Sequence, residues 1–469
     1  MSATGEQIER PGLIAASRAR LTRYLAKGGI AQALARGAAW SVGINVAGQA
    51  LSFVVQVVLT RSLGRVQYGN YAYALAWMNT ALLFAKLEMD TCSLRFIGVY
   101  DGAKSWSLLR GFLGRAARLV GFVSLGIAAV AALTVWIIAS HLRQGVAASL
   151  WAACALLPVT ASTELKARCL HAFKKVPESQ IPTLVLRPIL FGLGVALATY
   201  AFHLRLEAPA AIGVNALAAL IALLVLSRYL RRTIPREVQL AAPVFETRQW
   251  LHSAAGFLVI AAAQLVLGTQ MDVVVIGSML GGTQAGLYQI ASQLASLVSF
   301  GITAIIYLAL AMISDLHAKR LRAKLQHLVT LLSRVNLIVS LLVVTLLAFL
   351  GTEILGLFGH SFSAAYPVLM VLASANFVSA SVGILAGFLL TLTGHERQAA
   401  IVVVGGAVLN FTLSVVATRA FGAIGTASAT AVTAVLRSGV LAFYCWKLLR
   451  ILPGPFGGLR EGSEMSAGA

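Results

Sequence analysis

Long apolar runs, separated by short polar or Gly/Pro-containing breaks, occupy most of this chain. A helix needs about 20 apolar residues to cross the hydrocarbon core of a bilayer, and these runs reach that length or exceed it. About twelve of them can be separated, with approximate bounds 39–60, 68–95, 113–140, 146–165, 181–203, 208–228, 251–280, 285–314, 331–350, 364–392, 398–418 and 422–446. The pattern predicts an all-α integral membrane protein with about twelve transmembrane helices.

The composition agrees with this assignment. Hydrophobic residues make up 59% of the chain, charged residues make up 11%, and the mean hydropathy is +0.84. An ordinary soluble chain is about 25% charged. A single water-soluble core could not bury this much apolar sequence, so the class of soluble globular proteins is excluded.

The basic residues predict the orientation of the helices. If the N-terminus is placed in the cytoplasm, 28 of the 37 Lys and Arg residues fall in segments on the inner side and 5 in the outer loops. Inner connections of membrane proteins carry such an excess of Lys and Arg, so both termini are expected to be cytoplasmic. The net charge of +21 is then a signal of topology and not a nucleic-acid-binding surface, which would gather its cations on one soluble patch.

Two stretches of the chain repeat one pattern. RSLGRVQYGNYAYALAW at 61–77 and GSMLGGTQAGLYQIASQLA at 277–295 share LG-x-x-Q-x-G-x-Y at an offset of 217 residues, and AIG recurs at 211–213 and 423–425. Such spacing favours a duplication of six helices, and an even number of helices keeps both copies in the same orientation. Parallel repeats of this kind are typical of transporters. Residues 61–67 form the first outer turn, and we expect the aromatic residues after it, Tyr68, Tyr71, Tyr73 and Trp77, to lie at the outer membrane interface.

The repeat divides the chain into five parts. They are a basic cytoplasmic tail at 1–37, a first six-helix bundle at 38–228, a basic cytoplasmic linker at 229–249, a second six-helix bundle at 250–448 and a cytoplasmic tail at 449–469.

Polar residues recur at helical spacing inside three of the apolar runs. Helix packing alone can account for any single stripe, because small and polar residues line membrane helix interfaces. Stripes in the first, seventh and eighth runs together favour a shared wet cavity. The candidate cavity residues are Asn45, Gln49, Gln56, Gln264, Gln289 and Gln293.

Ionisable residues within the runs are costly and therefore mark candidate functional positions. The basic ones are Arg187, beside the helix-breaking Pro188, and Arg437, deep in the last run. Asp272 lies about 12 Å from the outer end of the seventh run by helical rise. The cluster KLEMDTCSLR adds Lys86, Glu88, Asp90 and Arg95, in which Lys86 and Asp90 are i, i+4 neighbours.

Catalytic and metal-binding motifs are absent from the sequence. No HExxH, GxSxG or phosphate-binding GxxxxGK[ST] pattern occurs, and the four cysteines have no CxxC spacing. We therefore predict no catalytic residue, no metal site, no cofactor and no enzymatic activity.

The sequence resembles a known family. NVAGQALSFVVQVVLTRSLGRVQYGNYAYALAW is similar to the opening of the bacterial O-antigen and exopolysaccharide flippases, which belong to the multidrug/oligosaccharidyl-lipid/polysaccharide exporter superfamily. The turn pattern of that family is matched at Arg61, Leu63, Gly64, Tyr68, Gly69 and Tyr71, and a second pattern at Asp272, Gly277, Gly286 and Tyr288. The resemblance covers nearly the whole chain. Its motifs are diffuse, so they indicate the superfamily better than the substrate.

The resemblance implies a V-shaped pair of six-helix bundles around a central cavity in the bacterial inner membrane. It also implies movement of a polyprenyl-diphosphate-linked oligosaccharide to the outer leaflet by alternating access, for surface polysaccharide or lipopolysaccharide biosynthesis. The candidate diphosphate ligands are then Arg187 and Arg437, with Lys86 and Arg95 behind them, and Asp272 or Glu88 is a candidate for coupling to H+ or Na+. Candidate protein partners are a glycan polymerase and chain-length proteins.

Two functional alternatives stay open, beside that of a non-transporting membrane scaffold. A multidrug exporter of the same superfamily would need a buried acidic cluster for its driving ion, whereas buried cations are at least as prominent here. A membrane glycan polymerase or ligase would need a sizeable outer loop with catalytic charges, which the sequence does not contain.

Overall fold

The computed structural model describes residues 29–143, 145–299, 312–313, 315–319 and 321–455. Within these ranges the chain is almost entirely helical and contains no strand. Most of the predicted N-terminal tail, the second half of the predicted eighth span and the end of the predicted C-terminal tail lie outside the described residues.

The helices follow the order that the apolar runs predict. Those of the first half are α2 (Gly29–Lys86), α3 (Met89–Gly102), α4 (Trp106–Ile138), α5 (Val146–Ala172), α6 (Val176–Gln180), α7 (Arg187–Ala196) and α8 (Ala208–Thr233). The connection between the halves contains α9 (Arg236–Leu240). Those of the second half are α10 (Thr247–Leu267), α11 (Thr269–Leu280), α12 (Gly282–Ser296), α14 (Arg322–Leu357), α15 (Tyr366–Val378), α16 (Ile384–Leu392) and α17 (Glu396–Tyr444).

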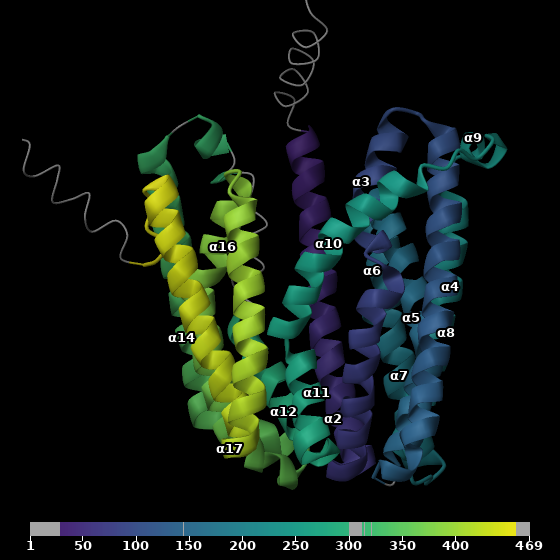
Figure 1. Ribbon diagram of the computed structural model, residues 1–469, viewed down its shortest axis with the longest axis vertical. Helices are drawn as coiled ribbons and strands as arrows, with labels where there is room; N and C mark the ends of the chain where they lie inside the picture. The colour runs from purple at the N-terminus through teal and green to yellow at the C-terminus, as the bar shows by residue number, and fades with distance from the viewer. Residues whose placement is uncertain (1–28, 144, 300–311, 314, 320, 456–469) are drawn as a thin grey trace, which may run out of the picture.

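Nine helices in the described ranges are long and apolar enough to cross a membrane. Two of them, Gly43–Gly102 with 60 residues and Glu396–Leu449 with 54, have well over twice the length of about 20 residues that one crossing needs. Each contains a glycine in the left-handed region, Gly64 (φ 68°) and Gly422 (φ 64°), where other residues are strained. The helix is kinked at each glycine, and the chain reverses direction within each of these two helices (Figure 1), so each accounts for two predicted spans. Helices α10 and α11 together cover the predicted span 251–280, and α12 covers the start of the predicted span 285–314.

The internal repeat is visible in the backbone. Gly64 (φ 68°, ψ 174°) and Gly281 (φ 96°, ψ 165°) hold the same place in the two copies of the motif and have similar dihedral angles. The second glycines of the motif, Gly69 and Gly286, lie against each other, since a Cβ on Gly286 would be 2.8 Å from the Cα of Gly69. The two copies therefore make the same turn and meet where the halves join.

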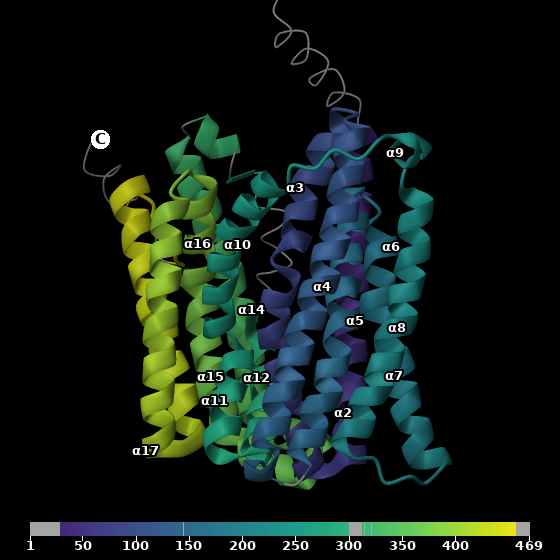
Figure 2. The ribbon, with the colours of Figure 1, turned by 45° about the vertical axis from the view of Figure 1, so that its right-hand side comes forward.

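The two halves form a V. In Figure 1 the helix groups are close at the lower end and diverge toward the upper end. Near the turns at Gly64 and Gly281 the Tyr73 hydroxyl lies 3.0 Å from Ser278 Oγ, and farther along α2 and α11 the Asn79 amide donates to Gln270 Oε1 at 3.2 Å. Both views place α3 and α9 at the open end (Figures 1 and 2), where the described chain also begins and ends.

Helix α10, the first helix of the second half, connects the two helix groups at the open end of the V. Trp250, near the start of α10, is 1% exposed and packs edge-on against Phe112 of α4, with ring centroids 5.3 Å apart. Its Nε1 donates to the Tyr100 hydroxyl of α3 at 3.0 Å. From there α10 crosses toward the second group and joins α11 (Figure 1). The start of α10 is therefore anchored on the first half.

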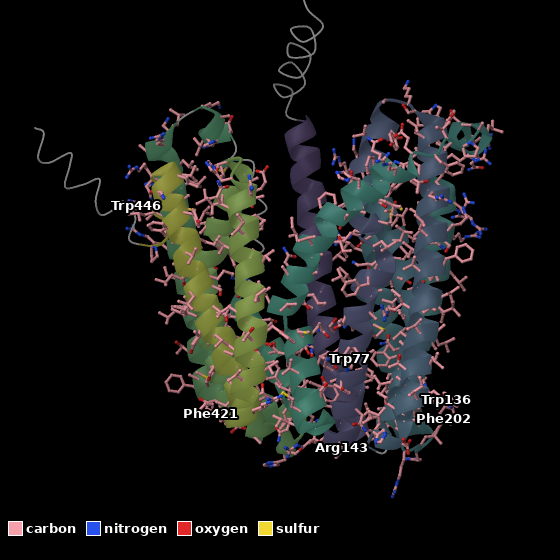
Figure 3. The ribbon with its side chains drawn as sticks, in the orientation of Figure 1. Trp77, Trp136, Arg143, Phe202, Phe421 and Trp446 are labelled. Carbon is pink, nitrogen blue, oxygen red and sulfur yellow. The ribbon has the colours of Figure 1, made fainter. Side chains whose placement is uncertain are left out.

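We expect Trp250→Ala to lower the free energy of unfolding by about 3–5 kcal/mol, because it removes a fully buried aromatic side chain and leaves a cavity. Trp446→Ala is the matched control, since Trp446 is 40% exposed and projects outward in Figure 3. Thermal unfolding of the detergent-purified variants measures both. Equal unfolding temperatures for the two variants would show that Trp250 does not anchor α10.

Candidate functional site

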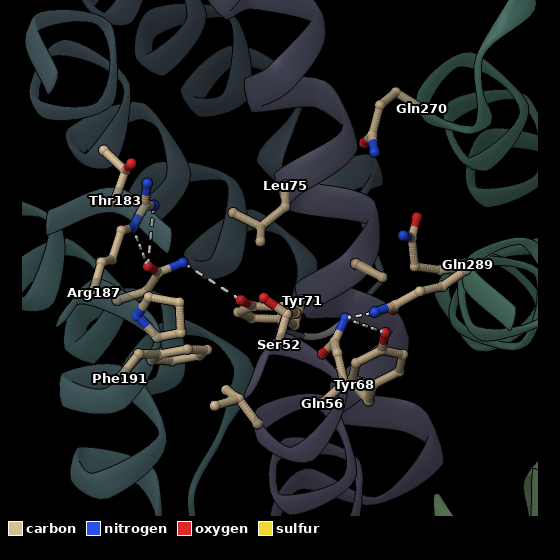
Figure 4. Close-up of a pocket in the computed structure, with 15 residues that line it drawn as sticks. Ser52, Gln56, Tyr68, Tyr71, Leu75, Thr183, Arg187, Phe191, Gln270 and Gln289 are labelled. Carbon is tan, nitrogen blue, oxygen red and sulfur yellow. Dashed lines mark hydrogen bonds between the residues drawn. The ribbon is translucent and has the colours of Figure 1, made fainter. Parts of the chain in front are cut away.

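A cavity of about 320 Å³ lies between the two halves. Ten of its fifteen lining residues carry polar side chains, and Arg187 is the one charged residue among them. The lining residues come from α2, the π-helix Ile181–Leu186, α7, α8, α11 and α12 (Figure 4). They are Ser52, Val55, Gln56, Tyr68, Tyr71, Ala72, Leu75, Thr183, Arg187, Pro188, Phe191, Asn215, Gln270, Gln289 and Gln293.

Local backbone irregularity positions Arg187. The chain widens into a π-helix over Ile181–Leu186, and two prolines, Pro182 and Pro188, each remove a backbone donor there. Single π-helical turns inside α-helices are frequent at functional sites. The irregular segment ends where α7 begins, at Arg187, and turns this side chain toward the cavity (Figure 4).

Asn215 of α8 holds the arginine. The Nε and Nη2 atoms of Arg187 donate to Asn215 Oδ1 at 3.2 and 3.1 Å, and Asn215 Nδ2 donates to the Tyr71 hydroxyl at 3.4 Å. Asn215 is 7% exposed. Among the described residues no carboxylate lies within 4 Å of the guanidinium, so a neutral partner orients the charge of Arg187 without neutralising it.

Aromatic rings and amides complete the wall. Tyr71 stacks on Phe191, with centroids 6.2 Å apart and an interplanar angle of 10°, and Tyr68 lies on its other side at 6.1 Å. Gln56 Nε2 donates to the Tyr68 hydroxyl at 3.3 Å and to Gln293 Oε1 of the other half at 3.1 Å. Neutral donors and acceptors beside aromatic faces can bind the hydroxyl groups and the apolar faces of sugars.

The expected position of the first-motif tyrosines is wrong for two of them. Tyr68 is 0% exposed and Tyr71 is 6% exposed, so both lie inside the protein and not at the membrane interface. An aromatic ring with a polar tip suits either environment. The hydroxyl groups of these two residues have partners on Gln56 and Asn215, which the local sequence does not reveal.

Lys86 lies at a break in the second crossing. Leu87 and Glu88 have positive φ values of 50° and 53°, and α3 restarts the helix after them. The predicted contact with Asp90 is confirmed at 2.9 Å, and Lys86 Nζ also lies 3.0 Å from Glu164 and 3.9 Å from Glu88. Three carboxylates therefore surround the one ammonium group.

We expect Lys86→Met to lower the free energy of unfolding by about 3–5 kcal/mol. It leaves Asp90 (side chain 2% exposed) and Glu88 (8%) as buried charges without their cation, and removing one partner of a buried ion pair has a cost of this size. Lys319→Met is the control, because the Lys319–Asp315 pair at 2.7 Å is exposed and such pairs contribute about 0–1 kcal/mol. Thermal unfolding compares the two, and an equal loss in both variants would contradict the argument.

The other predicted cations lie apart from this cavity. Arg95 is exposed on α3, with its guanidinium carbon 5.7 Å from the ring centroid of Phe96. Arg437 is half-buried in α17, and its aliphatic chain lies against Gly406.

The predicted polar residues divide into two groups. Gln56, Gln289 and Gln293 line the cavity. Asn45, Gln49 and Gln264 are exposed and lie outside its lining.

The two candidate coupling carboxylates lie in different halves. Asp272 is 3% exposed and accepts hydrogen bonds from the Tyr288 hydroxyl at 2.6 Å and from Thr430 Oγ1 at 3.0 Å. Tyr288 occupies the motif position of Tyr71, so equivalent tyrosines serve a basic centre in one half and an acidic centre in the other. Glu88 accepts from Thr91 Oγ1 at 2.5 Å.

Several lining residues were not predicted from the sequence. Asn215, Phe191 and Gln270 are the most informative of them. Asn215 carried a usable signal, because it is a single amide in the otherwise apolar run 208–228.

The part of the chain that the structure describes contains no group of three His, Cys, Asp or Glu residues placed to hold a metal ion. The four cysteines are unpaired. The cavity offers one cation, several amides and phenolic hydroxyls for the recognition of a ligand.

Comparison with known proteins identifies the family. Residues 34–317 match the model of the family described as "Polysaccharide biosynthesis protein", which is more than half of the chain. The chain belongs to this family, and its apolar helices make it a multi-pass membrane protein.

A curated relative and two solved structures are similar to the chain. The relative is the probable low-salt glycan biosynthesis flippase Agl15 of Haloferax volcanii, 26% identical over 211 residues, which are 44% of this chain and 43% of that protein. The chain thus aligns with less than half the length of this relative. The first structure, an inward-facing multidrug resistance MATE family transporter of the MOP superfamily, has a TM-score of 0.67 at 13% identity over 90% of this chain and 96% of its own. The second, the lipid II flippase MurJ in an inward closed conformation, has a TM-score of 0.65 at 14% identity over 86% and 87%. These two likenesses show that the fold is shared.

Proposed function

We propose that this protein is a lipid-linked oligosaccharide flippase that moves a polyprenyl-diphosphate-linked glycan from the inner to the outer leaflet. One observation carries the proposal: Arg187, which has no carboxylate within 4 Å in the described part of the chain, is oriented by an amide in a cavity between the two halves that is lined by neutral amides and hydroxyl groups. A diphosphate cannot enter hydrocarbon without cations and hydrogen-bond donors. Arg187 supplies the charge, and the glutamines and tyrosines beside it suit sugar hydroxyls.

The roles of the other cations follow from their surroundings. Arg437 remains a second candidate for the diphosphate. Lys86 has carboxylates on several sides, so the proposal gives it a structural role and leaves the diphosphate to Arg187 and Arg437. Asp272 or Glu88 is the proposed coupling group for H+ or Na+. The polyprenyl tail stays in the bilayer.

Alternating access follows from the V. In this proposal the open end faces the cytoplasm, both termini are cytoplasmic, and the membrane is a bacterial inner membrane. The excess of Lys and Arg in the segments at that end supports this orientation. The bundles 38–228 and 250–448 would rock about their contacts at the closed end, and the linker 229–249 would join them. Substrate would arrive from a glycan-assembly enzyme and leave toward a polymerase with its chain-length protein.

An ion-coupled multidrug exporter is the second candidate. The specific observation in its favour is the buried carboxylate Asp272, held by Tyr288 and Thr430 in the second half. The likeness in fold between this chain and a MATE family transporter is compatible with either function.

Lipid transfer in proteoliposomes tests the proposal. Purified full-length protein receives a fluorescent polyprenyl-diphosphate oligosaccharide, and a membrane-impermeant quencher reports which leaflet exposes it, with and without a pH or sodium gradient. The proposal expects protein-dependent transfer of the lipid-linked glycan. Efflux of cationic dyes without glycan transfer would favour the multidrug exporter.

A further inference from the structure

The connection between the two halves forms a strap along the first bundle. The strap, residues 234–247, runs beside α4. The backbone N–H of Val244 donates to Ser107 O at 3.0 Å, and Arg110 Nη1 donates to Ala241 O at 2.6 Å. A Cβ on Gly111 would be 1.8 Å from Val244 O, so only glycine permits this approach. The strap is therefore fixed in place on α4.

A cationic and apolar surface surrounds the strap. Phe245 is 48% exposed, and the guanidinium carbons of Arg115 and Arg118 lie 6.0 and 5.6 Å from its ring centroid. Leu240 is 85% exposed on the same segment. Within the described ranges no carboxylate lies within 4 Å of either guanidinium, so neither takes part in an ion pair there.

The depth of this surface can be placed along α4. Arg115 and Trp136 are 21 residues apart in one helix, which is about 30 Å at the rise of an α-helix. Trp136 is 67% exposed and projects outward near the end opposite the strap (Figure 3). Exposed tryptophans mark the membrane interface, and the hydrocarbon core is about 30 Å thick. Arg115, Arg118 and Phe245 therefore lie at the level of the lipid headgroups on the strap side.

We propose that Arg115, Arg118 and Phe245 form a binding site for the headgroup of an anionic phospholipid. The two guanidinium groups would bind the phosphate, and the exposed apolar side chains of the strap would enter the boundary with the acyl chains. Arg118 is the more available cation, because its Nε donates only within α4, to Gly114 O at 3.2 Å. Arg115 Nε also donates to Thr247 Oγ1 at 3.1 Å. Because the strap leads directly into α10, a bound lipid would hold the anchored start of that helix.

Native mass spectrometry of the detergent-purified full-length protein tests the site. Phosphatidylglycerol and phosphatidylcholine with acyl chains of different mass are added in equal amounts. The wild type is expected to retain phosphatidylglycerol preferentially. Arg118→Gln is expected to lower its affinity about fivefold, which corresponds to the contribution of about 1 kcal/mol per cation near an anionic surface. Arg118→Lys keeps the charge and is expected to keep most of the affinity.

Arg205→Gln is the matched control, since Arg205 is an exposed arginine in the loop before α8, which lies at the opposite end. It should bind phosphatidylglycerol as the wild type does, and all variants should unfold at the wild-type temperature. Three outcomes would overturn the proposal: no lipid preference in the wild type, an equal loss in Arg205→Gln, or unchanged binding when Arg115→Gln and Arg118→Gln are combined. Displacement of phosphatidylglycerol by an equimolar polyprenyl diphosphate would also overturn it, because the site would then belong to the transported lipid.

Discussion

Gly69→Ala is expected to shift the protein toward a conformation in which the closed end of the V opens. An added Cβ would lie 2.3 Å from Gly282 O and 2.8 Å from the backbone N of Thr283. Backbone atoms cannot move aside as a flexible side chain does. Overpacking of this kind costs about 1–3 kcal/mol, and that cost applies only while the halves are in contact. The equilibrium between the two conformations should therefore shift by about 5- to 150-fold.

Thiol accessibility measures this shift. Gln289 lines the cavity, so in the orientation proposed above a Gln289→Cys thiol is reached from the outer side only when the closed end opens. Three of the native cysteines are buried, and Cys154 is replaced by alanine to lower the background. A membrane-impermeant maleimide added outside should label the Gly69→Ala protein several-fold to about a hundredfold faster than its parent.

Gly98→Ala is the matched control, because nothing lies within 4 Å of the Cβ that it would add on α3. Its labelling rate should equal that of the parent. Gly286→Ala should act like Gly69→Ala, since its Cβ would lie 2.8 Å from the Cα of Gly69. Unchanged labelling in folded Gly69→Ala and Gly286→Ala proteins would show that these glycines do not control the closed end.

The apolar pattern predicts the helices because a membrane-spanning segment has one dominant requirement, a run of about 20 apolar residues. Long apolar runs and breaking glycines specify where the chain enters, turns and leaves, and Gly64 and Gly281 were visible as turn positions of a repeated motif. The contact partner of Gly69 was not visible. A glycine that permits close approach and one that permits a turn look the same in a sequence.

The candidate site was predicted in part for a similar reason. Polar residues inside apolar helices are energetically costly in a membrane, so they could be singled out from the sequence. The structure brings four of them to one cavity: Gln56, Arg187, Gln289 and Gln293. Contacts between distant segments carry no such mark. The Lys86–Asp90 pair lies within one stretch and could be predicted, whereas Glu164 reaches the same ammonium group from a separate helix.

Arg187→Gln is expected to reduce transfer of the polyprenyl-diphosphate glycan by about 10- to 150-fold. A hydrogen bond to a charged group contributes about 1.5–3 kcal/mol, and glutamine keeps an amide donor but loses the charge. Arg187→Lys keeps the charge but not the planar fork that bonds Asn215 Oδ1, so an intermediate rate is expected. Arg95→Gln is the control, since Arg95 is exposed on α3 and should transfer glycan at the wild-type rate.

Asn215→Asp tests whether transfer needs the net positive charge of the cavity or only the Arg187 side chain. The arginine stays in place, and its Nε and Nη2 atoms, now 3.2 and 3.1 Å from the amide oxygen, would face a carboxylate. The new ion pair would neutralise the one charge in the cavity wall while keeping the fold intact, because the shape of the side chain is unchanged. Transfer should fall as far as in Arg187→Gln, with an unfolding temperature at or above that of the wild type. Wild-type transfer by Asn215→Asp would mean that a free positive charge at Arg187 is not what the substrate requires, and the diphosphate role would then pass to Arg437.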